Sequence, residues 1–376
     1  MADFLRDLFR AMPKAELHMH LDGALEVKTA IELMTGRAPD AKAPDGGGTE
    51  CPKNAAGGAF RAQSYEALYR RLVIDGPLAT QAALLGRYDL PIELLQSEEA
   101  LERVTDDLLR AKAADRVRYC EIRWAPALHC AGGLGVRRVV ESVARATKRA
   151  CARYGILARL IVVGMRFHAP RENVSMLRQA AEADARGLLA AADLAGPEAA
   201  HPDPTVQQPF FDAARRLGLG LTLHCGELPS SADAIRRCVL RVAPDRIAHG
   251  SGAAADESLC ALLAERGIRL DLCPTSNIQA GLYADYADFP VATLFRRGVP
   301  VSISTDSPVI SGLTLSEEYY RTAAGGRLGP AELWAINLAS LDSIFAEDAV
   351  KRALKAEFRA WAHGVSELCP DASRPD

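Results

Sequence analysis

The chain has 376 residues, of which 49% are hydrophobic, so it is long enough to bury a large core. Its formal net charge is −3 and it contains no tract rich in Lys or Arg, which disfavours a nucleic-acid partner. No apolar run reaches the ~18 residues that a membrane-spanning helix needs, and the N-terminus lacks the apolar core of a secretory signal. The nine cysteines include no C-x-x-C pair. We therefore expect a cytoplasmic protein with reduced thiols and no membrane partner.

Eight short apolar runs, each closed by polar residues, glycine or proline, form the main pattern along the chain. Continuous runs of this kind are typical of strands that are buried on both faces, as in parallel sheets. We expect strands at 15–20, 117–124, 158–165, 187–194, 219–225, 245–250, 268–273 and 299–304. Helical patterns lie between most of them, for example at 98–114, 136–155 and 256–267. Eight strand–helix units favour an α/β fold of the (β/α)₈ TIM-barrel type.

An open, doubly wound sheet is the rival interpretation, and such a sheet commonly binds a dinucleotide on a glycine-rich turn. The nearest match to that turn is formed by Gly218 and Gly220, but the third position is Leu223. These glycines also precede a predicted strand instead of following one. We therefore favour the barrel.

Two regions depart from the alternation of strands and helices. Residues 36–58 are rich in Gly, Pro and Ala and predict a loose loop, and residues 60–95 predict helices. Together, 36–95 would form a lid-like insertion after the first strand. Residues 314–363 predict two or three covering helices after the eighth strand. We expect the whole chain, 1–376, to form one hydrolase domain.

The first predicted strand contains two histidines, His18 and His20, although the chain has only eight. Alternate residues of a strand point to the same face, so both imidazoles would lie on one side. If that side is the barrel interior, a metal ion is the usual reason to bring them together. A pair of exposed or hydrogen-bonded histidines is the alternative.

Further polar residues fall at the C-terminal ends of later predicted strands, where barrel enzymes carry their active sites. His224 and Glu227 follow the fifth strand, His249 the sixth, and Asp306 the eighth. Histidine and carboxylate ligands without a thiolate suit an open, catalytic Zn²⁺ site, although iron, cobalt and manganese accept the same ligands. A bound divalent ion lowers the pKa of coordinated water towards ~7, so hydrolysis is the expected reaction class.

These stretches resemble the adenosine deaminase family of the amidohydrolase superfamily. The matching motifs are PKAELHMHLDGAL (13–25), DLAGPE (193–198), LHCGE (223–227), RIAHG (246–250), CPTSN (273–277) and STDSP (304–308), in the family's order. The resemblance implies a barrel with one zinc ion, and it identifies the ligands as His18, His20, His224 and Asp306. It also implies hydrolytic deamination of adenosine or 2′-deoxyadenosine to inosine or 2′-deoxyinosine, with release of ammonia. The partner would be a small purine nucleoside, and the oligomeric state stays open.

The resemblance also assigns catalytic roles. Glu227 matches the general acid that protonates purine N1, His249 the residue that orients the attacking water, and Asp306 the group that takes up its proton. Ser276 matches a residue that supports the sixth-strand histidine, His249. Protonation of N1 requires a carboxylic acid that keeps its proton near pH 7, and desolvation in a closed pocket can provide one.

Three further positions match contacts to the substrate. Asp22 matches the contact to the ribose 5′-hydroxyl, and Gly196 the backbone contact at N3. The family's commonest pattern has a second Asp after the metal aspartate, which bonds purine N7, and this chain has Ser307 there. Adenine, aminodeoxyfutalosine or an adenosine-like biosynthetic intermediate therefore remain alternative substrates. A non-catalytic barrel protein is the last alternative, and the complete set of acid and ligand residues argues against it.

Overall fold

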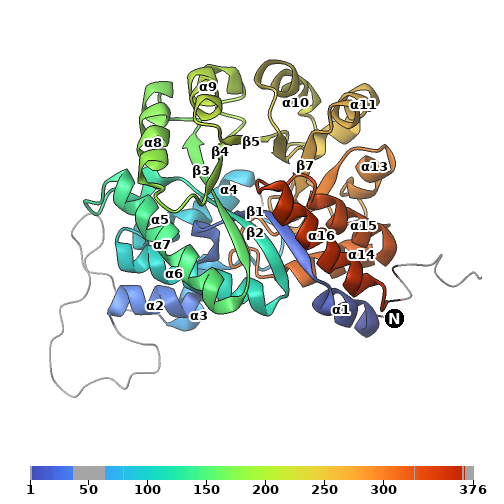
Figure 1. Ribbon diagram of the computed structural model, residues 1–376, viewed down its shortest axis with the longest axis horizontal. Helices are drawn as coiled ribbons and strands as arrows, with labels where there is room; N and C mark the ends of the chain where they lie inside the picture. Colours follow the sequence, from blue (N-terminus) through green and yellow to red (C-terminus); the bar gives the residue numbers. More distant parts are fainter. Residues whose placement is uncertain (1, 37–63, 79, 326, 366–367, 369–376) are drawn as a thin grey trace, which may run out of the picture.

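The computed structural model describes residues 2–36, 64–78, 80–325, 327–365 and 368. Eight parallel strands lie side by side in chain order and are surrounded by helices (Figure 1). They are β1 (Lys14–His20), β2 (Val117–Trp124), β3 (Leu157–Met165), β4 (Leu189–Ala195), β5 (Gly220–Cys225), β6 (Arg246–His249), β7 (Arg269–Leu272) and β8 (Val301–Ile303). The predicted (β/α)₈ barrel is confirmed, and each strand boundary lies within two residues of its expected position.

The barrel closes between β1 and the segment that follows β8. The amide of His20 donates to the carbonyl of Asp306 (2.7 Å), and the amide of Asp306 donates to the carbonyl of His18 (3.1 Å). Met19 and Asp306 form the corresponding parallel bridge. The backbone bonds that close the barrel therefore join residues that the sequence predicts as metal ligands.

Helices follow most strands, as the sequence pattern predicts. They are α6 (Glu98–Ala114), α7 (Val136–Tyr154), α8 (Pro170–Ala183), α9 (Gln208–Arg216), α10 (Ala232–Arg237), α11 (Glu257–Arg266), α12 (Pro274–Gln279) and α13 (Val291–Arg296). Short helical turns are η1 (Asp22–Ala24), η3 (Pro126–His129), η4 (Pro204–Gln207), η5 (Cys238–Val242) and η6 (Ser251–Ala255). The bounds of α11 were predictable because residues at both ends fix them. Asp256 caps the first turn by accepting a hydrogen bond from the Leu259 amide, and Gly267 ends the helix at φ +65°.

The segment between β1 and α6 is helical where the structure describes it. It contains α2 (Val27–Thr35), α3 (Tyr65–Leu72), α4 (Gln81–Leu85), η2 (Gly86–Tyr88) and α5 (Asp89–Leu94). The loose loop predicted at 36–58 lies outside the described residues, apart from its first residue. The described part matters for function because α4, η2 and α5 border a cavity at the C-terminal ends of the strands.

Additional helices precede the first strand and follow the last strand of the barrel. The expected C-terminal helices are α14 (Leu315–Gly325), α15 (Pro330–Ser340) and α16 (Asp348–Ala362), and α1 (Ala2–Ala11) precedes β1. The entry to β1 is fixed by Lys14, whose ammonium group donates to the carbonyls of Phe9 (2.8 Å) and Met12 (2.7 Å). Burial lowers the pKa of Lys14 to about 8.

The barrel interior contains a network of buried ion pairs. Arg246 pairs with Glu121 and with Asp271 (3.1 Å), and Arg123 pairs with Asp193 (3.0 Å) and with Asp271 (3.7 Å). All five side chains are 0% exposed. Buried charges of this kind are tolerated because each has an opposite charge beside it.

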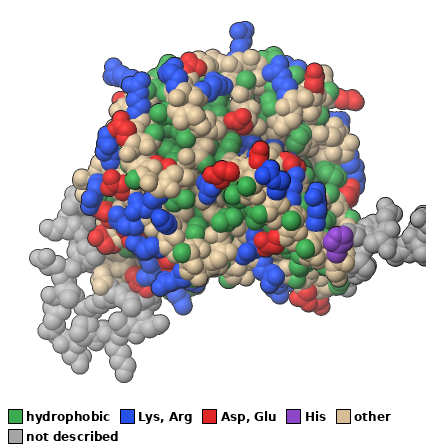
Figure 2. Space-filling view, in the orientation of Figure 1, with side chains coloured by type: hydrophobic (Ala, Val, Ile, Leu, Met, Phe, Trp, Pro, Cys, Tyr) green, Lys and Arg blue, Asp and Glu red, His purple; other side chains and the backbone are tan. Residues whose placement is uncertain are grey.

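The outer surface carries charges of both signs. On the face drawn in Figure 2, Lys and Arg side chains lie among Asp and Glu side chains. Arg138 and Arg145 of α7, for example, both pair with Glu98 of α6, the latter at 2.9 Å. Within the part of the chain that the structure describes, no helix is both long enough and apolar enough to cross a membrane.

Candidate active site

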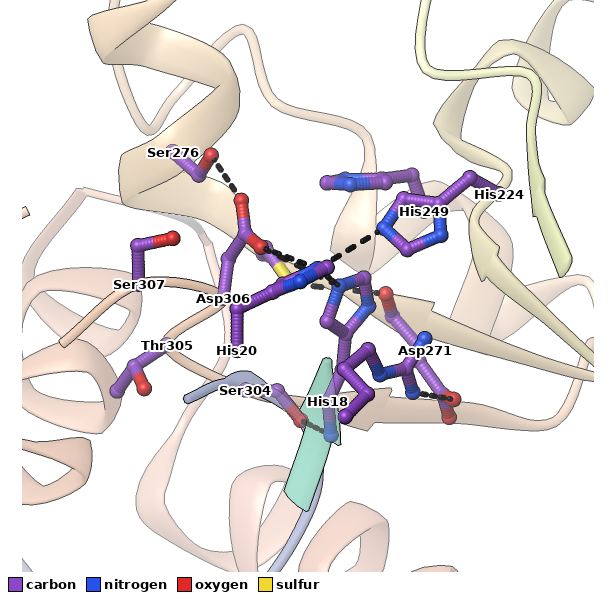
Figure 3. Close-up of polar contacts among 12 residues, drawn as sticks. His18, His20, His224, His249, Asp271, Ser276, Ser304, Thr305, Asp306 and Ser307 are labelled. Atoms are coloured by element: carbon purple, nitrogen blue, oxygen red, sulfur yellow. Dashed lines mark hydrogen bonds and ion pairs between the residues drawn. The ribbon is translucent and has the colours of Figure 1, made fainter. Parts of the chain in front are cut away.

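Five side chains converge at the C-terminal ends of four strands (Figure 3). His18 and His20 come from β1, His224 from β5 and His249 from β6, and Asp306 follows β8. Three contacts involve His20: its Nε2 lies 3.3 Å from Nε2 of His18, 3.1 Å from Nε2 of His224 and 3.4 Å from Oδ1 of Asp306. Nε2 of His18 lies 3.3 Å from the same Asp306 oxygen.

This spacing fits one divalent ion. Ligand atoms placed 2.0–2.1 Å from a tetrahedral zinc ion lie ~3.3 Å from one another. Burial lowers the pKa of His18 well below its ordinary range and lowers that of His20 to about 4, so both rings are neutral at pH 7. Neutral imidazoles that present lone pairs to each other repel, and a cation between them removes the repulsion. A ring nitrogen of His249 also lies within 4.8 Å of ligand atoms of His18, His224 and Asp306.

Asp306 is ionised at this site. Burial alone would raise its pKa, but the contact with His18 and the electrostatic interactions with His20 and His249 hold the pKa well below the ordinary value. Its other carboxylate oxygen accepts a hydrogen bond from the Ser276 hydroxyl (2.6 Å). An ionised carboxylate with one oxygen fixed in this way presents the other to the imidazole cluster.

The sequence led us to expect a contact between Ser276 and His249, but the hydroxyl group of Ser276 contacts Asp306 instead. Ser276 contacts Asp306, and the neighbouring Asn277 contacts His249, with 3.3 Å between Asn277 Oδ1 and His249 Nδ1. The motif CPTSN starts α12 directly after β7, and adjacent residues of a helix point about 100° apart. Neighbouring residues therefore face different members of the cluster.

The backbone at two of the converging residues is left-handed. His249 has φ +64° and Asp306 has φ +60°, a region that is uncommon for residues other than glycine. Both residues stand where a short strand turns away from the barrel, and the conformation directs each side chain toward the cluster. Such conformations are concentrated at functional sites.

Glu227 lies beside the cluster and has the properties expected of an acid. Burial raises its pKa, and the charge of Asp306 adds to this effect, although nearby imidazoles act in the opposite direction. Its carboxyl group contacts Asn277 Nδ2 (3.4 Å) and accepts a hydrogen bond from Gln81 of α4. The loop that carries it is fixed by Glu198, which accepts from the amide of Glu227 (3.3 Å). A raised pKa favours the protonated form.

A cavity of about 300 Å³ opens next to these groups. Asp22 and Gly196, two of the three expected substrate contacts, line it, and Gly196 has φ +118°. Ser307, the third, is 1% exposed and does not line the cavity. Its hydroxyl group contacts the hydroxyl group of Tyr88, and Tyr88 lines the cavity in its place.

Comparison with known proteins agrees with this arrangement. A model of the adenosine deaminase family matches residues 13–361. The chain belongs to the adenosine deaminase family. The adenosine deaminase of Clostridium perfringens is 30% identical over 344 residues, which cover 92% of this chain and 97% of that protein. That of Lacticaseibacillus paracasei is 31% identical over 346 residues, with 92% and 94% coverage.

Solved structures with the same fold are more distant in sequence. The adenine deaminase of Arthrobacter aurescens superposes with a TM-score of 0.82 at 23% identity, covering 94% of this chain and 99% of that one. A zinc-bound amidohydrolase of Burkholderia ambifaria gives 0.80 at 24% identity, covering 97% and 95%. As a member of the adenosine deaminase family, the chain is a metal-dependent aminohydrolase, as its motifs predict.

Three residues around the site of this adenosine deaminase homologue were not expected from its sequence. Gln81 and Tyr88 reach the site from the insertion, and Asp193, inside the motif DLAGPE, lies 3.0 Å from Nδ1 of His224. Nothing in the local pattern of the insertion distinguishes Gln81 or Tyr88 from other helix residues. For Asp193 a signal exists, because a charged residue inside an apolar predicted strand needs a buried partner.

Proposed function

We propose that the chain catalyses zinc-dependent hydrolytic deamination of adenosine or 2′-deoxyadenosine, releasing ammonia. The observation that carries the proposal is Glu227, a buried carboxyl group of raised pKa beside a cluster of neutral imidazoles. Deamination at C6 of a purine needs an acid for the ring nitrogen, and a buried carboxyl is suited to that task. The adenosine deaminases that are 30–31% identical to this chain support the choice of substrate.

In this proposal one zinc ion is held by His18, His20, His224 and Asp306. Their spacing and the absence of a thiolate from this set suit zinc, and the zinc-bound neighbour of the same fold supports the choice. When bound, the ion supplies a water molecule that is acidic enough to attack at neutral pH. One ion per chain and a cytoplasmic location are part of the proposal.

The residues of the chain then have the following tasks. Glu227 donates its proton to purine N1, which makes C6 electrophilic. His249 orients the attacking water, and its contact with Asn277 supports this role by fixing the ring. Asp306 accepts the proton of that water, and its hydrogen bond with Ser276 holds the carboxylate in position.

Binding of the nucleoside would use the cavity beside these groups. Asp22 accepts a hydrogen bond from the ribose 5′-hydroxyl, and the backbone of Gly196 contacts N3. The contact between Ser307 and Tyr88 supports a modified role for Ser307: the two hydroxyl groups act as a pair, and Tyr88 presents the donor to N7. Burial keeps the pKa of Tyr88 well above its usual value, so the phenol keeps its proton.

Ammonia release by the zinc-loaded protein tests the proposal. We expect adenosine and 2′-deoxyadenosine to be deaminated, chelation to abolish the activity, and about one zinc ion to be present per chain. A strong preference for adenine or aminodeoxyfutalosine would favour the alternative, to which the replacement of the usual second Asp by Ser307 already points. Absence of ammonia from every amino-purine would favour a non-catalytic barrel.

A further inference from the structure

The cavity has two chemically different sides. The predicted metal ligands and His249 come from β1, β5, β6 and the segment after β8. The opposite wall is built from the ends of β2, β3 and β4 together with α4 and α5, and most of its side chains are apolar, with Gln81, Asp89 and Glu198 as the exceptions. Six of its residues are Leu85, Ile92, Leu128, Val163, Met165 and Phe167. Phe167 is 48% exposed, so part of this apolar wall reaches the surface.

The described residues that line the cavity include no cationic side chain of the kind that binds phosphate. Among the described residues that line it there is no Lys or Arg, whereas five acidic side chains line it: Asp22, Asp89, Glu198, Asp306 and the proposed protonated acid Glu227. A phosphate monoester carries close to two negative charges at pH 7 and is normally bound by Arg, Lys or a metal ion. A phosphate group in this cavity would face carboxylates and apolar side chains.

Two arginines adjoin lining residues in the sequence, but both are occupied elsewhere. Arg166 lies between Met165 and Phe167, and its guanidinium donates to the carbonyls of His201 and His224 (2.7 Å each). Arg87 precedes Tyr88, and its guanidinium donates to backbone carbonyls of α3, with a distance of 2.6 Å to Arg70. Neither side chain lines the cavity.

The direction in which a nucleoside extends follows from the proposed function, on which this inference rests. With C6 beside the imidazole cluster, Asp22 on the sugar and Gly196 at N3, the sugar lies toward the ends of β2 and β3. On this placement, groups attached at the 5′ end would extend toward the apolar lining residues at this end of the cavity, Leu128, Met165 and Ile92. Asp22 Oδ1 lies 2.8 Å from Nε2 of the buried His129, which follows β2, so Asp22 and the end of β2 lie on the same side of the cavity.

We infer that the preferred substrate is an amino-purine nucleoside that carries an uncharged, apolar group at its 5′ end, and that 5′-phosphorylated nucleosides are excluded. Burial of the apolar group against the wall between α5 and the ends of β2 and β3 favours such a compound over adenosine. The acidic side chains other than Glu227, and the absence of Lys and Arg from the described lining residues, disfavour a nucleotide.

The test compares three compounds on the zinc-loaded enzyme: adenosine, adenosine 5′-phosphate and 5′-benzylthio-5′-deoxyadenosine. We expect kcat/KM for the benzylthio compound to exceed the value for adenosine by about tenfold or more. The value for the phosphate should fall at least about a hundredfold below the value for adenosine. Equal or better turnover of the phosphate, or no gain from the benzylthio group, overturns the inference but leaves the proposed deamination intact. If no compound releases ammonia, the proposed function fails. The inference about the 5′ group is then tested separately by calorimetry with the corresponding inosine products, whose affinities must follow the same order: benzylthio compound, then inosine, then phosphate.

Variants of the apolar wall separate this effect from general damage. Leu128→Arg places a cation in the wall and should reduce the preference for the benzylthio compound over the phosphate by at least about tenfold. Ile92→Gln, a milder change in α5, should reduce the gain from the benzylthio group. Leu240→Arg is the matched control, because Leu240 is 52% exposed and does not line the cavity. A preference that is unchanged in both wall variants contradicts the inference.

Discussion

Asp193 lies 3.0 Å from Nδ1 of His224 and 3.0 Å from the guanidinium of Arg123, so one buried carboxylate joins a proposed metal ligand to the ion pairs inside the barrel. Burial would raise the pKa of Asp193, but His224 and Arg123 together hold it well below the usual range. The ionised carboxylate fixes the ring of His224 with Nε2 directed at the cluster. It also makes the ring a stronger electron donor toward a bound cation.

Replacement of Asp193 tests this connection. Asp193→Asn keeps the shape but removes the charge, and we expect the affinity for zinc to fall about 10- to 100-fold, as measured by competition with a chelator. The surface control is Asp212→Asn, because Asp212 is half-exposed and its ion pair with Arg215 is long, at 3.6 Å. Unchanged zinc affinity in Asp193→Asn would show that the contact with His224 does not tune the site.

Glu227→Gln tests the assignment of the acid. The amide keeps the size and most hydrogen bonds of the side chain but has no acidic proton for N1. We expect kcat to fall by about 10²–10⁴ while the zinc content, measured by atomic spectroscopy, stays at the wild-type level. Glu66→Gln on the exposed surface of α3 is the control. Near-normal turnover of Glu227→Gln would assign the acid to another residue.

The residues at the strand ends were predictable from the sequence, and the reason is geometric. A strand of known start and direction fixes which alternate side chains face inward, so His18 and His20 were expected on one side of β1. The parallel order of the strands then brings their C-terminal ends together, which places His224 and Asp306 beside them. Apolar periodicity and strand direction were sufficient for this part of the site.

The contributions of the insertion were not predictable in the same way. Gln81 and Tyr88 stand on short helices that follow a long glycine-rich segment, and such a segment does not fix where the next helix docks. The contacts of Ser276 with Asp306 and of Asn277 with His249 were not predictable from the motif alone, because α12 begins within it and turns neighbouring side chains in different directions. Both failures concern side-chain directions that depend on tertiary packing.

The hydroxyl contact between Tyr88 and Ser307 can be tested with a double-mutant cycle. Loss of one neutral hydrogen bond is worth ~0.5–1.5 kcal/mol, so Ser307→Ala should lower kcat/KM for adenosine about three- to tenfold. If the two hydroxyl groups act as a pair, Tyr88→Phe should add little to this loss, and 7-deazaadenosine should be nearly insensitive to either change. Additive losses, or equal losses with both substrates, would contradict the shared role at N7.

Glu318 of α14 predicts a pH-dependent stability. It accepts hydrogen bonds from the amide (2.8 Å) and hydroxyl groups of Thr275, but burial outweighs these donors and raises its pKa from 4.5 to about 7. The unfolded chain therefore loses this proton at lower pH than the folded chain, and the stability that the group contributes is lost as the pH rises from 4.5 through about 7.

The variant Glu318→Gln does not titrate, which makes the effect measurable. Relative to wild type, its free energy of unfolding should be higher (the variant more stable) at pH 8 than at pH 5, by at most about 3 kcal/mol. Urea denaturation at the two pH values gives this difference, and Glu357→Gln, at an exposed ion pair, is the control. A difference between variant and wild type that is the same at both pH values would contradict the raised pKa.

The left-handed backbone at His249 and Asp306 has a consequence for how this chain can change. Each of these residues holds a conformation that glycine adopts more easily, and the preference is worth about 1 kcal/mol or more per position. A screen that selects variants for thermal stability alone would therefore enrich Gly at 249 and 306 and discard the chemistry. Selection for turnover has the opposite effect, since it keeps both side chains at the expense of the melting temperature.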